Sequence, residues 1–525
     1  MATIYDAFDV EYRLEYLGLP VHPEWRKNIK RWSYYSDSFN GGNDFRSGQY
    51  LVKYILESGE EFENRIKATP LDNHCKSVVE TYNSFLFRTP PKRDYGTQVG
   101  NDPSLDPFLA DADLDGRTFD AFMRDCATYS AVYGHIWVMV DKPNTQVSIR
   151  AEELSQDIRP YVSLITPENV IDWKYERKPN GVYALSSITL LDGIDDKSAY
   201  YRTITATETT IYTRTNQNQE ASIVDVIPNP IGVVPCIPVY AGRSQTKAIG
   251  ISDISDIADM QRAIYNELSE LEQLIRVSNH PSLVKTSSTQ ASAGAGAVID
   301  LPDDLDPNLK PYLLEPNGSG IDHILSSIKE KVDSINRMAN MGGVRSTTTR
   351  QLSGIAMQTE RELLNARLSQ KADNLELAEE HIWRLWALWQ GKVWDGVVDY
   401  PDSFNIHDKE NTVALLKLAK ETNPQNGELL KQIDIMLAKA LIKDEDVLEQ
   451  VINYQAEAEE IEEEMEHPSL AGESTEEKNE HIQEMIMDGL TDQQILDKHS
   501  ELTQAMINTA KQALLDLNNG GNNNV

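Results

Sequence analysis

The amino-acid sequence predicts an α+β fold built from several domains. Three features lead to this prediction. Apolar residues recur at helical spacing through the first ninety residues and again through most of the second half of the chain. A segment rich in β-branched residues and turn signals lies between these parts, at 159–242. Two long amphipathic helices then bracket a short segment rich in Gly, Ala and Pro.

The composition narrows the function. At roughly 150 residues per domain, a chain of 525 residues suggests about three or four domains. With 49 Lys and Arg against 83 Asp and Glu, the formal net charge is −34. Proteins that coat DNA neutralise its phosphates with basic side chains, so this charge argues against a DNA-coating role. It is compatible with a protein that lets DNA pass without binding it.

The cysteines and the apolar runs indicate the compartment. Cys75, Cys126 and Cys236 are far apart and have no metal-ligand spacing, so we expect reduced thiols and no disulfide framework. The N-terminus has no basic stretch followed by an apolar core, so no signal peptide is expected. The longest nearly apolar run, 131–140, is about half of what a transmembrane helix needs. We therefore expect no membrane association.

The N-terminal region reads as helical. Amphipathic helices are expected over 49–58, 71–87 and 116–131, and a buried strand follows at His135–Val140. The β-rich segment contains five predicted strands, separated by turn signals. Four prolines, from Pro228 onward, are expected to end this region. These strands cover 161–166, 182–190, 200–205, 209–215 and 221–227.

A helix over 252–278 and a second helix over 321–341 form an αα-hairpin with an inserted tip at 280–320. The tip contains strand-like runs at 282–286, 291–297 and 298–301. A hairpin cannot bury both faces of its helices alone, so we expect the apolar stripe of the first helix to pack against neighbouring subunits of a closed ring. That stripe consists of Ile257, Ile264, Leu268, Leu271 and Ile275.

A polar, basic loop follows the hairpin at 342–353, then a very long helix at 354–390. The loop contains Arg345, Thr347, Thr348, Thr349 and Arg350. The long helix ends in tryptophans spaced three apart, which favours core or subunit packing over base stacking. A strand at 397–404 and helices to about residue 465 come next. Two short helices, at 476–488 and 492–515, precede a tail that we expect to be disordered from Asn518.

Motifs for catalysis or metal binding are weak. Asp111, Asp113 and Asp115 match the opening of a calcium loop, but Phe122 stands where the bidentate Glu is required. We therefore expect Asp111 or Asp115 to cap the helix that begins near residue 117. The sequence has no phosphate-binding loop, no His-Glu-x-x-His and no nucleophile elbow, and isolated histidines such as His135 are usually structural. We expect no catalytic, cofactor-binding or metal-binding residues and no enzyme activity.

The order of these elements resembles that of the portal proteins of tailed bacteriophages, over roughly residues 45 to 465. Four stretches are similar in detail. They are Phe119–Asp141, where Tyr133-Gly134-His135 ends a helix before a buried strand; Arg159–Trp173; Ile237-Pro238 with Ser255–Gln261; and Leu352–Met357, which leads into the long helix. These are similarities of composition and order.

The resemblance implies a portal-protein fold with an α/β wing, a two-helix stem, a small β-containing clip and a helical crown. It leaves residues 471–525 and the first forty residues unassigned. The implied wing consists of 1–248 together with the long helix and strand at 354–404. The other implied parts are stem helices at 249–279 and 321–341, a clip at 280–320, a tunnel loop at 342–353 and a crown at 405–470.

The resemblance also implies a function. The chain would form a head–tail connector, a dodecamer at one capsid vertex of the virion, with its subunits made in the host cytoplasm. Double-stranded DNA would be packaged and ejected through its channel. The implied partners are the terminase packaging motor, neck or adaptor proteins, and capsid and scaffold proteins. No cofactor is implied.

Charge along the stem and the loop predicts the character of such a channel. The first stem helix is acidic, whereas the loop carries only Arg345 and Arg350. An acidic wall would keep DNA mobile, and the arginines would either touch phosphates or pair with neighbouring subunits. The carboxylates expected in the channel are Asp253, Asp256, Glu267 and Glu270.

Two alternatives stay open. One is another structural protein of the virion, in the neck or the capsid. The other is a nucleic-acid enzyme such as a nuclease or terminase. That enzyme would need clustered metal-binding carboxylates or a phosphate loop, and the sequence shows neither.

Overall fold

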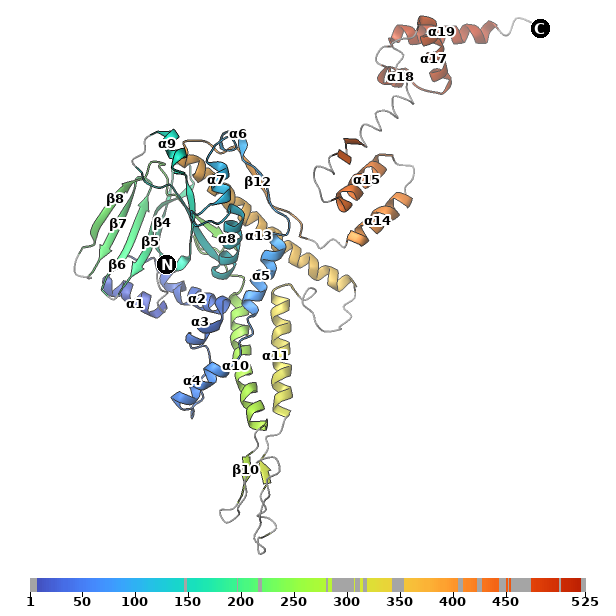
Figure 1. Cartoon of the computed structure of the whole chain (residues 1–525). Helices are drawn as coiled ribbons and strands as arrows, with labels where there is room; N and C mark the ends of the chain where they lie inside the picture. Colours follow the sequence, from blue (N-terminus) through green and yellow to red (C-terminus); the bar gives the residue numbers. More distant parts are fainter. Residues whose placement is uncertain are drawn as a thin grey trace. The chain divides into compact units, whose positions relative to one another are not determined.

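The computed structural model shows a chain of two compact units, 1–405 and 406–525, and each is described by itself. The first unit combines sheets with many helices, which confirms the predicted α+β class (Figure 1). The residues that the structure describes are 7–145, 149–195, 197–215, 220–279, 282–285, 306, 312–314, 319–341, 354–404, 409–422, 427–442, 450–451, 453–454, 474–499 and 502–520.

Five helices open the chain. They are α1 (Ala7–Leu17), α2 (Pro23–Asn40), α3 (Gly42–Ser47), α4 (Gly59–Ala68) and α5 (His74–Leu86). The helix predicted over 71–87 is α5. The helix predicted over 49–58 is wrong, because this segment is a loop and α4 starts only after it. Ser58 and Glu61 form a capping box that fixes the start of α4. The backbone N–H and carbonyl groups of Val52 bond to the side chains of Asn266 and Arg65, outside the segment.

A three-stranded antiparallel sheet forms the centre of the first unit. Its strand order is β3 (Tyr161–Ile165), β2 (His135–Asp141), β9 (Cys236–Tyr240). The strand predicted at His135–Val140 is confirmed as β2, which α8 (Phe119–Tyr133) enters through Gly134. The prolines expected to end the β region do not all end it, since Pro238 lies inside β9. This is possible because β9 is an edge strand, where a missing N–H breaks no ladder bond.

A second, five-stranded sheet is an antiparallel meander in sequence order. Its strands are β4 (Val170–Arg177), β5 (Tyr183–Ile194), β6 (Ala199–Thr205), β7 (Glu208–Arg214) and β8 (Ser222–Pro228). All five predicted strands are present, as β3 and β5 to β8. The strands missed in these two sheets are β4 and β9. Strand β4 starts directly after a 3-10 turn at Pro167–Asn169 and its buried residues do not alternate. Strand β9 contains Pro238, which was expected to end the β region.

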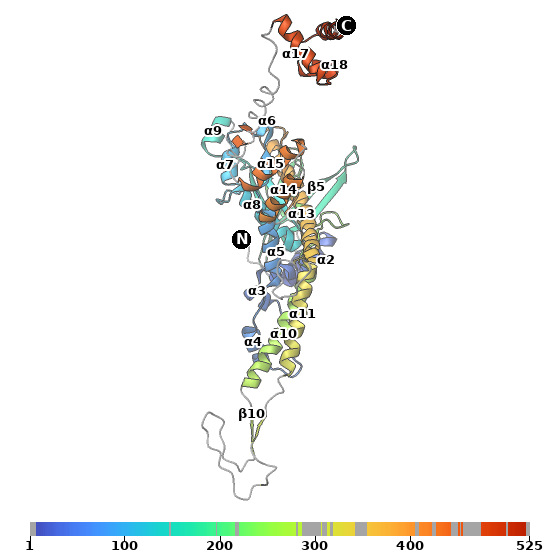
Figure 2. The same cartoon turned by 90° about the vertical axis from the view of Figure 1, so that its right-hand side faces the viewer.

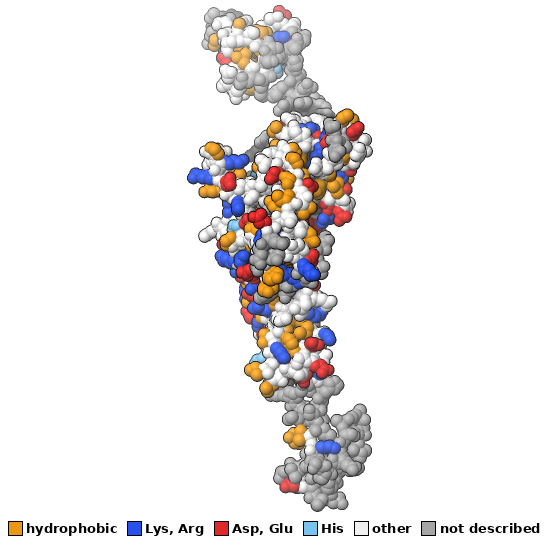
Figure 3. All heavy atoms as spheres, turned by 90° about the vertical axis from the view of Figure 1, so that its left-hand side faces the viewer, with side chains coloured by type: hydrophobic (Ala, Val, Ile, Leu, Met, Phe, Trp, Pro, Cys, Tyr) orange, Lys and Arg blue, Asp and Glu red, His pale blue; other side chains and the backbone are white. Residues whose placement is uncertain are grey.

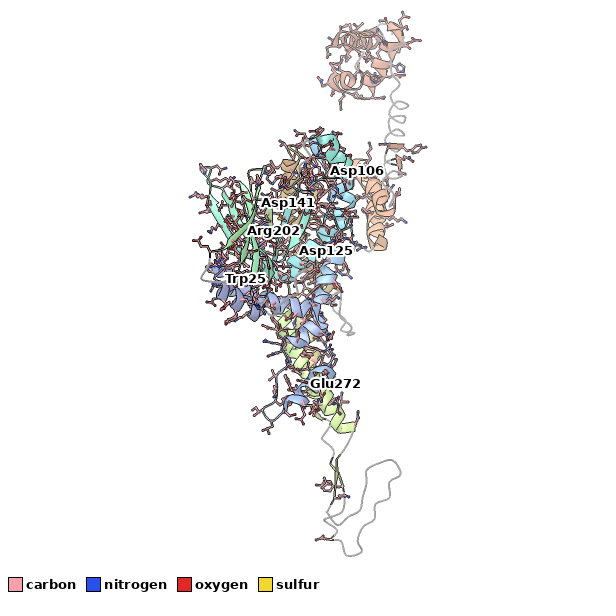
Figure 4. All side chains as sticks on the ribbon, turned by 60° about the vertical axis from the view of Figure 1, so that its left-hand side comes forward. Trp25, Asp106, Asp125, Asp141, Arg202 and Glu272 are labelled. Carbon is pink, nitrogen blue, oxygen red and sulfur yellow. The ribbon has the colours of Figure 1, made fainter. Side chains whose placement is uncertain are left out.

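The two sheets approach each other where the ring centroids of Trp137 in β2 and Trp173 in β4 lie 6.3 Å apart. Asp141 of β2 and Arg202 of β6, both labelled in Figure 4, lie near enough for the guanidinium charge to act on the carboxyl. Burial raises the pKa of the Asp141 carboxyl, and the charge of Arg202 partly offsets this rise. The small elements around the sheets are α6 (Gly96–Val99), α7 (Leu105–Ala110) and α9 (Arg150–Ser155).

Helix α13 (Gly354–Trp389) brings the second half of the chain back to this centre, where it packs on β2, β9, α5 and α8. Its tryptophans Trp383 and Trp386 are fully buried and contact Phe108, which confirms the prediction of core packing. The strand expected at 397–404 is shorter. It is β12 (Val397–Asp399), which pairs with β1 (Lys92–Asp94).

The second unit is helical in its described residues. Helices α14 (Lys409–Thr422) and α15 (Gly427–Leu441) are joined by an ion pair of 2.5 Å between Lys420 Nζ and Asp434 Oδ1. The acidic run at 457–466 lies outside the described residues.

Three helices form the end of the chain. They are α17 (Thr475–Met487), α18 (Asp492–Lys498) and α19 (Gln504–Gly520). The single helix predicted over 492–515 is therefore wrong. The break between α18 and α19 lets Ile495 and Ile507 pack together with Ile482 in one small core. The disorder expected from Asn518 is also wrong for its first three residues, because α19 continues through Gly520.

Candidate functional site

The feature that stands out is a hairpin of two antiparallel helices, α10 (Ser255–Asn279) and α11 (Ser319–Met338), as predicted. Figures 1 and 2 show the two helices running side by side away from the sheets, and Figure 4 places Glu272 towards the far end of α10. Beyond them, β10 (Ser282–Val284) pairs with β11 (Tyr312–Leu314). This confirms the strand predicted at 282–286. The strand-like runs at 291–297 and 298–301 lie outside the described residues.

The apolar stripe of α10 packs inside the subunit, which corrects the prediction that neighbouring subunits cover it. Ile257, Ile264 and Leu271 are 2%, 1% and 7% exposed, and Leu268 and Ile275 are partly buried. Ile257 and Ile264 belong to the main core, and α10 contacts α2, α5 and α11. The prediction failed because it did not place the N-terminal helices beside the hairpin.

Two of the four carboxylates expected in a channel are paired within the chain. Asp253, just before α10, forms ion pairs with Lys371 and, at 3.4 Å, with Arg367 of α13. Glu267 accepts from Lys331 Nζ at 2.6 Å and from Ser327 Oγ at 2.8 Å. Asp253 is therefore not an exposed channel charge, and Glu267 is largely neutralised. Asp256 and Glu270 are exposed, so the hairpin presents less negative charge than predicted.

Both ends of the hairpin are bound to α13, and the end after α11 is also bound to α5. Arg367 of α13, which pairs with Asp253, also donates to the carbonyl oxygen of Met338 at 3.1 Å. The hydroxyl of Tyr82 in α5 donates to the carbonyl oxygen of Ala339 at 2.7 Å. Arg367 and Lys371 both lie over the Tyr82 ring. We call the cluster of Asp253, Arg367, Lys371, Tyr82 and Ala339 the root. It closes the base of the hairpin, and its Asp253 side chain is only 8% exposed.

Further contacts hold α10 against the N-terminal helices. Gln261 is fully buried, accepts from the backbone N–H of Cys75 at 2.9 Å and donates to the carbonyl oxygen of Ser38 at 2.9 Å. The hydroxyl of Tyr34 in α2 donates to the carbonyl oxygen of Ala258 at 2.7 Å. A buried polar side chain with paired donors and acceptors fixes one packing arrangement. The first turns of α10 are thus packed against the N-terminal helices in one arrangement.

The expected basic loop, with Arg345, Thr347, Thr348, Thr349 and Arg350, lies outside the described residues, as does most of the predicted clip. The contact of these arginines with DNA or with neighbouring subunits stays a prediction. The same holds for the roles proposed for Asp256 and Glu270.

The aspartates of the calcium-like motif serve the local backbone. Asp113 accepts from the N–H groups of Asp115 and Arg117 and pairs with the Arg117 guanidinium. The helix cap is Thr118, which corrects the expectation that Asp111 or Asp115 caps α8. In the described part of the chain, no group of three or more His, Cys, Asp and Glu could hold a metal ion.

The nucleophilic and titratable groups of the core are sequestered. All three cysteines are buried as free thiols, and burial raises their pKa values well above the usual range. His135 is fully buried, which lowers its pKa to about 3, and its Nδ1 accepts from the N–H of Gly250 at 3.3 Å. No helix of the described residues is long and apolar enough to span a bilayer.

Comparisons with known proteins give matches among solved structures alone. No family model matches the chain, and no curated protein matches it. Two similar solved structures are the neck of an empty gene transfer agent particle, with C6 symmetry, and the virion of a native gene transfer agent particle. The neck chain is 8% identical with a TM-score of 0.39, over 74% of this chain and 95% of that chain. The virion chain is 8% identical with a TM-score of 0.38, over 75% and 95%. At such low TM-scores this likeness carries no weight in assigning fold or function.

Proposed function

We propose that the chain is the portal subunit of a tailed bacteriophage. Twelve copies form a ring at one capsid vertex, through which DNA is packaged and ejected. The hairpin is the stem, and its tip at 280–320 is the clip that meets the packaging motor and later the neck proteins. The body binds capsid and scaffold proteins. The role is structural, with no catalysis and no cofactor.

The observation that carries this proposal is the hairpin with its root. A stem must transmit force between the clip and the body without bending at its base. Here Asp253 and Ala339, at the two ends of the hairpin, are tied to α13 and α5. Exposed carboxylates on α10, Asp256 and Glu270, support a wall that repels phosphate.

Electron microscopy of the purified full chain in negative stain, together with native mass spectrometry, tests the proposal. We expect closed rings with a central hole and a mass of about twelve subunits. A second experiment measures binding of a linear DNA duplex to these rings at physiological salt, and we expect weak binding because the chain is acidic. A monomer or a globular dimer would contradict the portal and favour another structural protein of the virion.

A further inference from the structure

The loop between α3 and α4 exposes apolar side chains that the monomer leaves without cover. Ile55 is 100% exposed and its neighbour Leu56 is 95% exposed, and Val52 and Tyr54 are exposed beside them. We call residues 52–56 the apolar loop. Figure 3 shows hydrophobic side chains at the surface over α4 and the nearby end of the hairpin. Adjacent, fully exposed aliphatic residues of this kind mark interaction surfaces.

The apolar loop is held in a fixed shape by Arg65, which is 4% exposed. Its guanidinium donates to both carboxylate oxygens of Glu57 at 2.8 Å and to the carbonyl oxygen of Val52 at 2.6 Å. It also donates to Ser269 Oγ of α10 at 3.0 Å and lies 4.0 Å from the Tyr54 ring centroid. The loop is therefore attached to the hairpin and arranged before any partner arrives, which lowers the entropic cost of binding.

A matching surface lies on the other helix of the hairpin. Ile321, Leu325 and Lys329 are spaced by four residues and so share one face of α11. Leu325 is 48% exposed, Ile321 is partly buried and Lys329 is exposed. We call these three residues the α11 face.

The two surfaces lie at the same height along the hairpin. Glu267 bonds Ser327, and each helix then continues two residues in the same direction, to Ser269 on α10 and to Leu325 on α11. Ser269 is the residue that anchors the apolar loop through Arg65. Figure 1 shows α4, which follows the loop, and α11 on opposite sides of α10.

We propose that the apolar loop of one subunit packs on the α11 face of a second copy of this chain. A contact between two different patches at equal height is heterologous, and rotation about an axis along the hairpin closes it into a ring. Each surface carries charges of both signs, Lys53 with Glu60, Glu61 and Glu63 around the loop and Lys329 with Glu330 on α11, so opposite charges are available to pair across the contact. This inference rests on the proposed ring and names the residues that hold neighbouring stems together.

Cross-linking between introduced cysteines tests the contact directly. The three native cysteines are buried, so Leu56→Cys and Leu325→Cys in one chain provide the accessible thiols for a short bismaleimide. We expect a ladder of covalent multimers on a denaturing gel. The control pair, Ile223→Cys with Leu325→Cys, places the first thiol on β8, where Ile223 is 61% exposed. This control should give no ladder.

Substitution of the loop provides the second arm. Ile55→Ser with Leu56→Ser removes only exposed apolar surface, so the melting temperature measured by circular dichroism of unassembled subunits should not change. The fraction of subunits in rings should fall at least tenfold. The control Ile223→Ser with Val224→Ser removes two adjacent aliphatic side chains of β8, 61% and 62% exposed, and should assemble like the wild type.

The outcomes separate this inference from the proposed function. If wild-type rings form but the Leu56–Leu325 pair gives no cross-link, or the loop variant still assembles normally, the docking contact is wrong and the ring stands. If the wild type forms no rings at all, both proposals fail.

Discussion

Arg93 and Glu379 form a buried, two-pronged ion pair that joins β1 to α13. Their Nε–Oε1 and Nη2–Oε2 distances are 2.5 and 3.1 Å, and the Glu379 side chain is fully buried. The same carboxylate accepts from the Tyr400 hydroxyl at 2.8 Å and from Trp383 Nε1 at 3.2 Å. The Glu379 carboxylate thus binds Arg93, almost 300 positions earlier in the chain, and connects α13 to the N-terminal half of the first unit.

Glu379→Gln should lower the free energy of unfolding by roughly 3 kcal/mol, because the buried Arg93 guanidinium then keeps only the half-exposed Asp120 as a charged partner. Urea denaturation of the purified chain measures the change. Asp120→Asn is the matched control. It removes a second carboxylate bound to Arg93, at 2.6 Å, but one that is 57% exposed, so its effect should stay below about 1 kcal/mol. Equal effects of the two variants would show that burial of the pair is unimportant.

Asp253→Asn should loosen the root of the hairpin. The buried ammonium of Lys371 loses its counter-charge, and we expect a loss of roughly 3 kcal/mol together with faster hydrogen exchange at the body end of α10 and α11. Asp256→Asn, three residues on and exposed, serves as control and should change the free energy of unfolding by less than about 0.5 kcal/mol. Unchanged hydrogen exchange in the Asp253 variant would show that the root does not hold the base of the hairpin.

The Glu168 carboxyl gives stability a dependence on pH. Burial raises its pKa to about 7, and it lies 3.1 Å from the Tyr133 hydroxyl. Because the folded chain keeps this proton at a pH where the unfolded chain has lost it, the stabilisation is full below about pH 4.5 and is lost as the pH rises through 7. Up to about 3 kcal/mol is involved. The stability of wild type minus that of Glu168→Gln, measured from pH 4 to 8, should fall by this amount; a flat difference contradicts the prediction.

Gly134 is required for a reason beyond its positive φ. Gly134 lies in the turn between α8 and β2, and a Cβ there would lie 2.7 Å from the backbone carbonyl carbon of Gly250. Gly116 has nearly the same φ, +87° against +89°, with no atom within 4 Å of the added Cβ. Gly116→Ala should therefore cost about 1 kcal/mol from backbone strain alone, and Gly134→Ala at least about 2 kcal/mol more. Thermal melts of the two variants give the comparison, and equal costs would be contrary to it.

Arg345→Gln with Arg350→Gln tests the expected basic loop. If the arginines touch phosphates, rings should assemble normally while particles retain packaged DNA less well. Retention is measured as DNA lost from filled particles at a given temperature. Asp402→Asn, an exposed charge change in the segment after β12, is the control. Failure of the double variant to assemble would instead indicate pairing between subunits.

The sequence was informative where one local pattern determines the element. The strands β5 to β8, which are rich in β-branched residues and bounded by turn signals, and the apolar stripes of α10 and α11 follow from such local patterns. Strand β4 lacks alternation because it is buried on both faces near Val170, and its start coincides with a turn signal. The segment 49–58 shows the reverse error, since its apolar residues have helical spacing but face solvent or contact other elements.

The candidate site depended on long-range contacts, which no local pattern contains. The stripe on α10 was correctly identified, but its partners are α2 and α5, some 200 residues earlier in the chain. Arg65 is an ordinary basic residue of a short amphipathic helix in the sequence. Its burial becomes evident only when Glu57, Val52 and Ser269 surround it in space.

The root also bears on how such a chain could change over generations. Asp253 and Ala339 lie at either end of the hairpin and are each held by the body, and the α10 residues that join the body core, Ile257, Gln261 and Ile264, lie in the half of α10 away from the tip. A tip could be lengthened, shortened or exchanged between lineages as long as the two anchoring positions kept their neighbours. Transplanting a foreign tip between the helices is therefore a practical route to chimeras that keep one body and take up a new specificity.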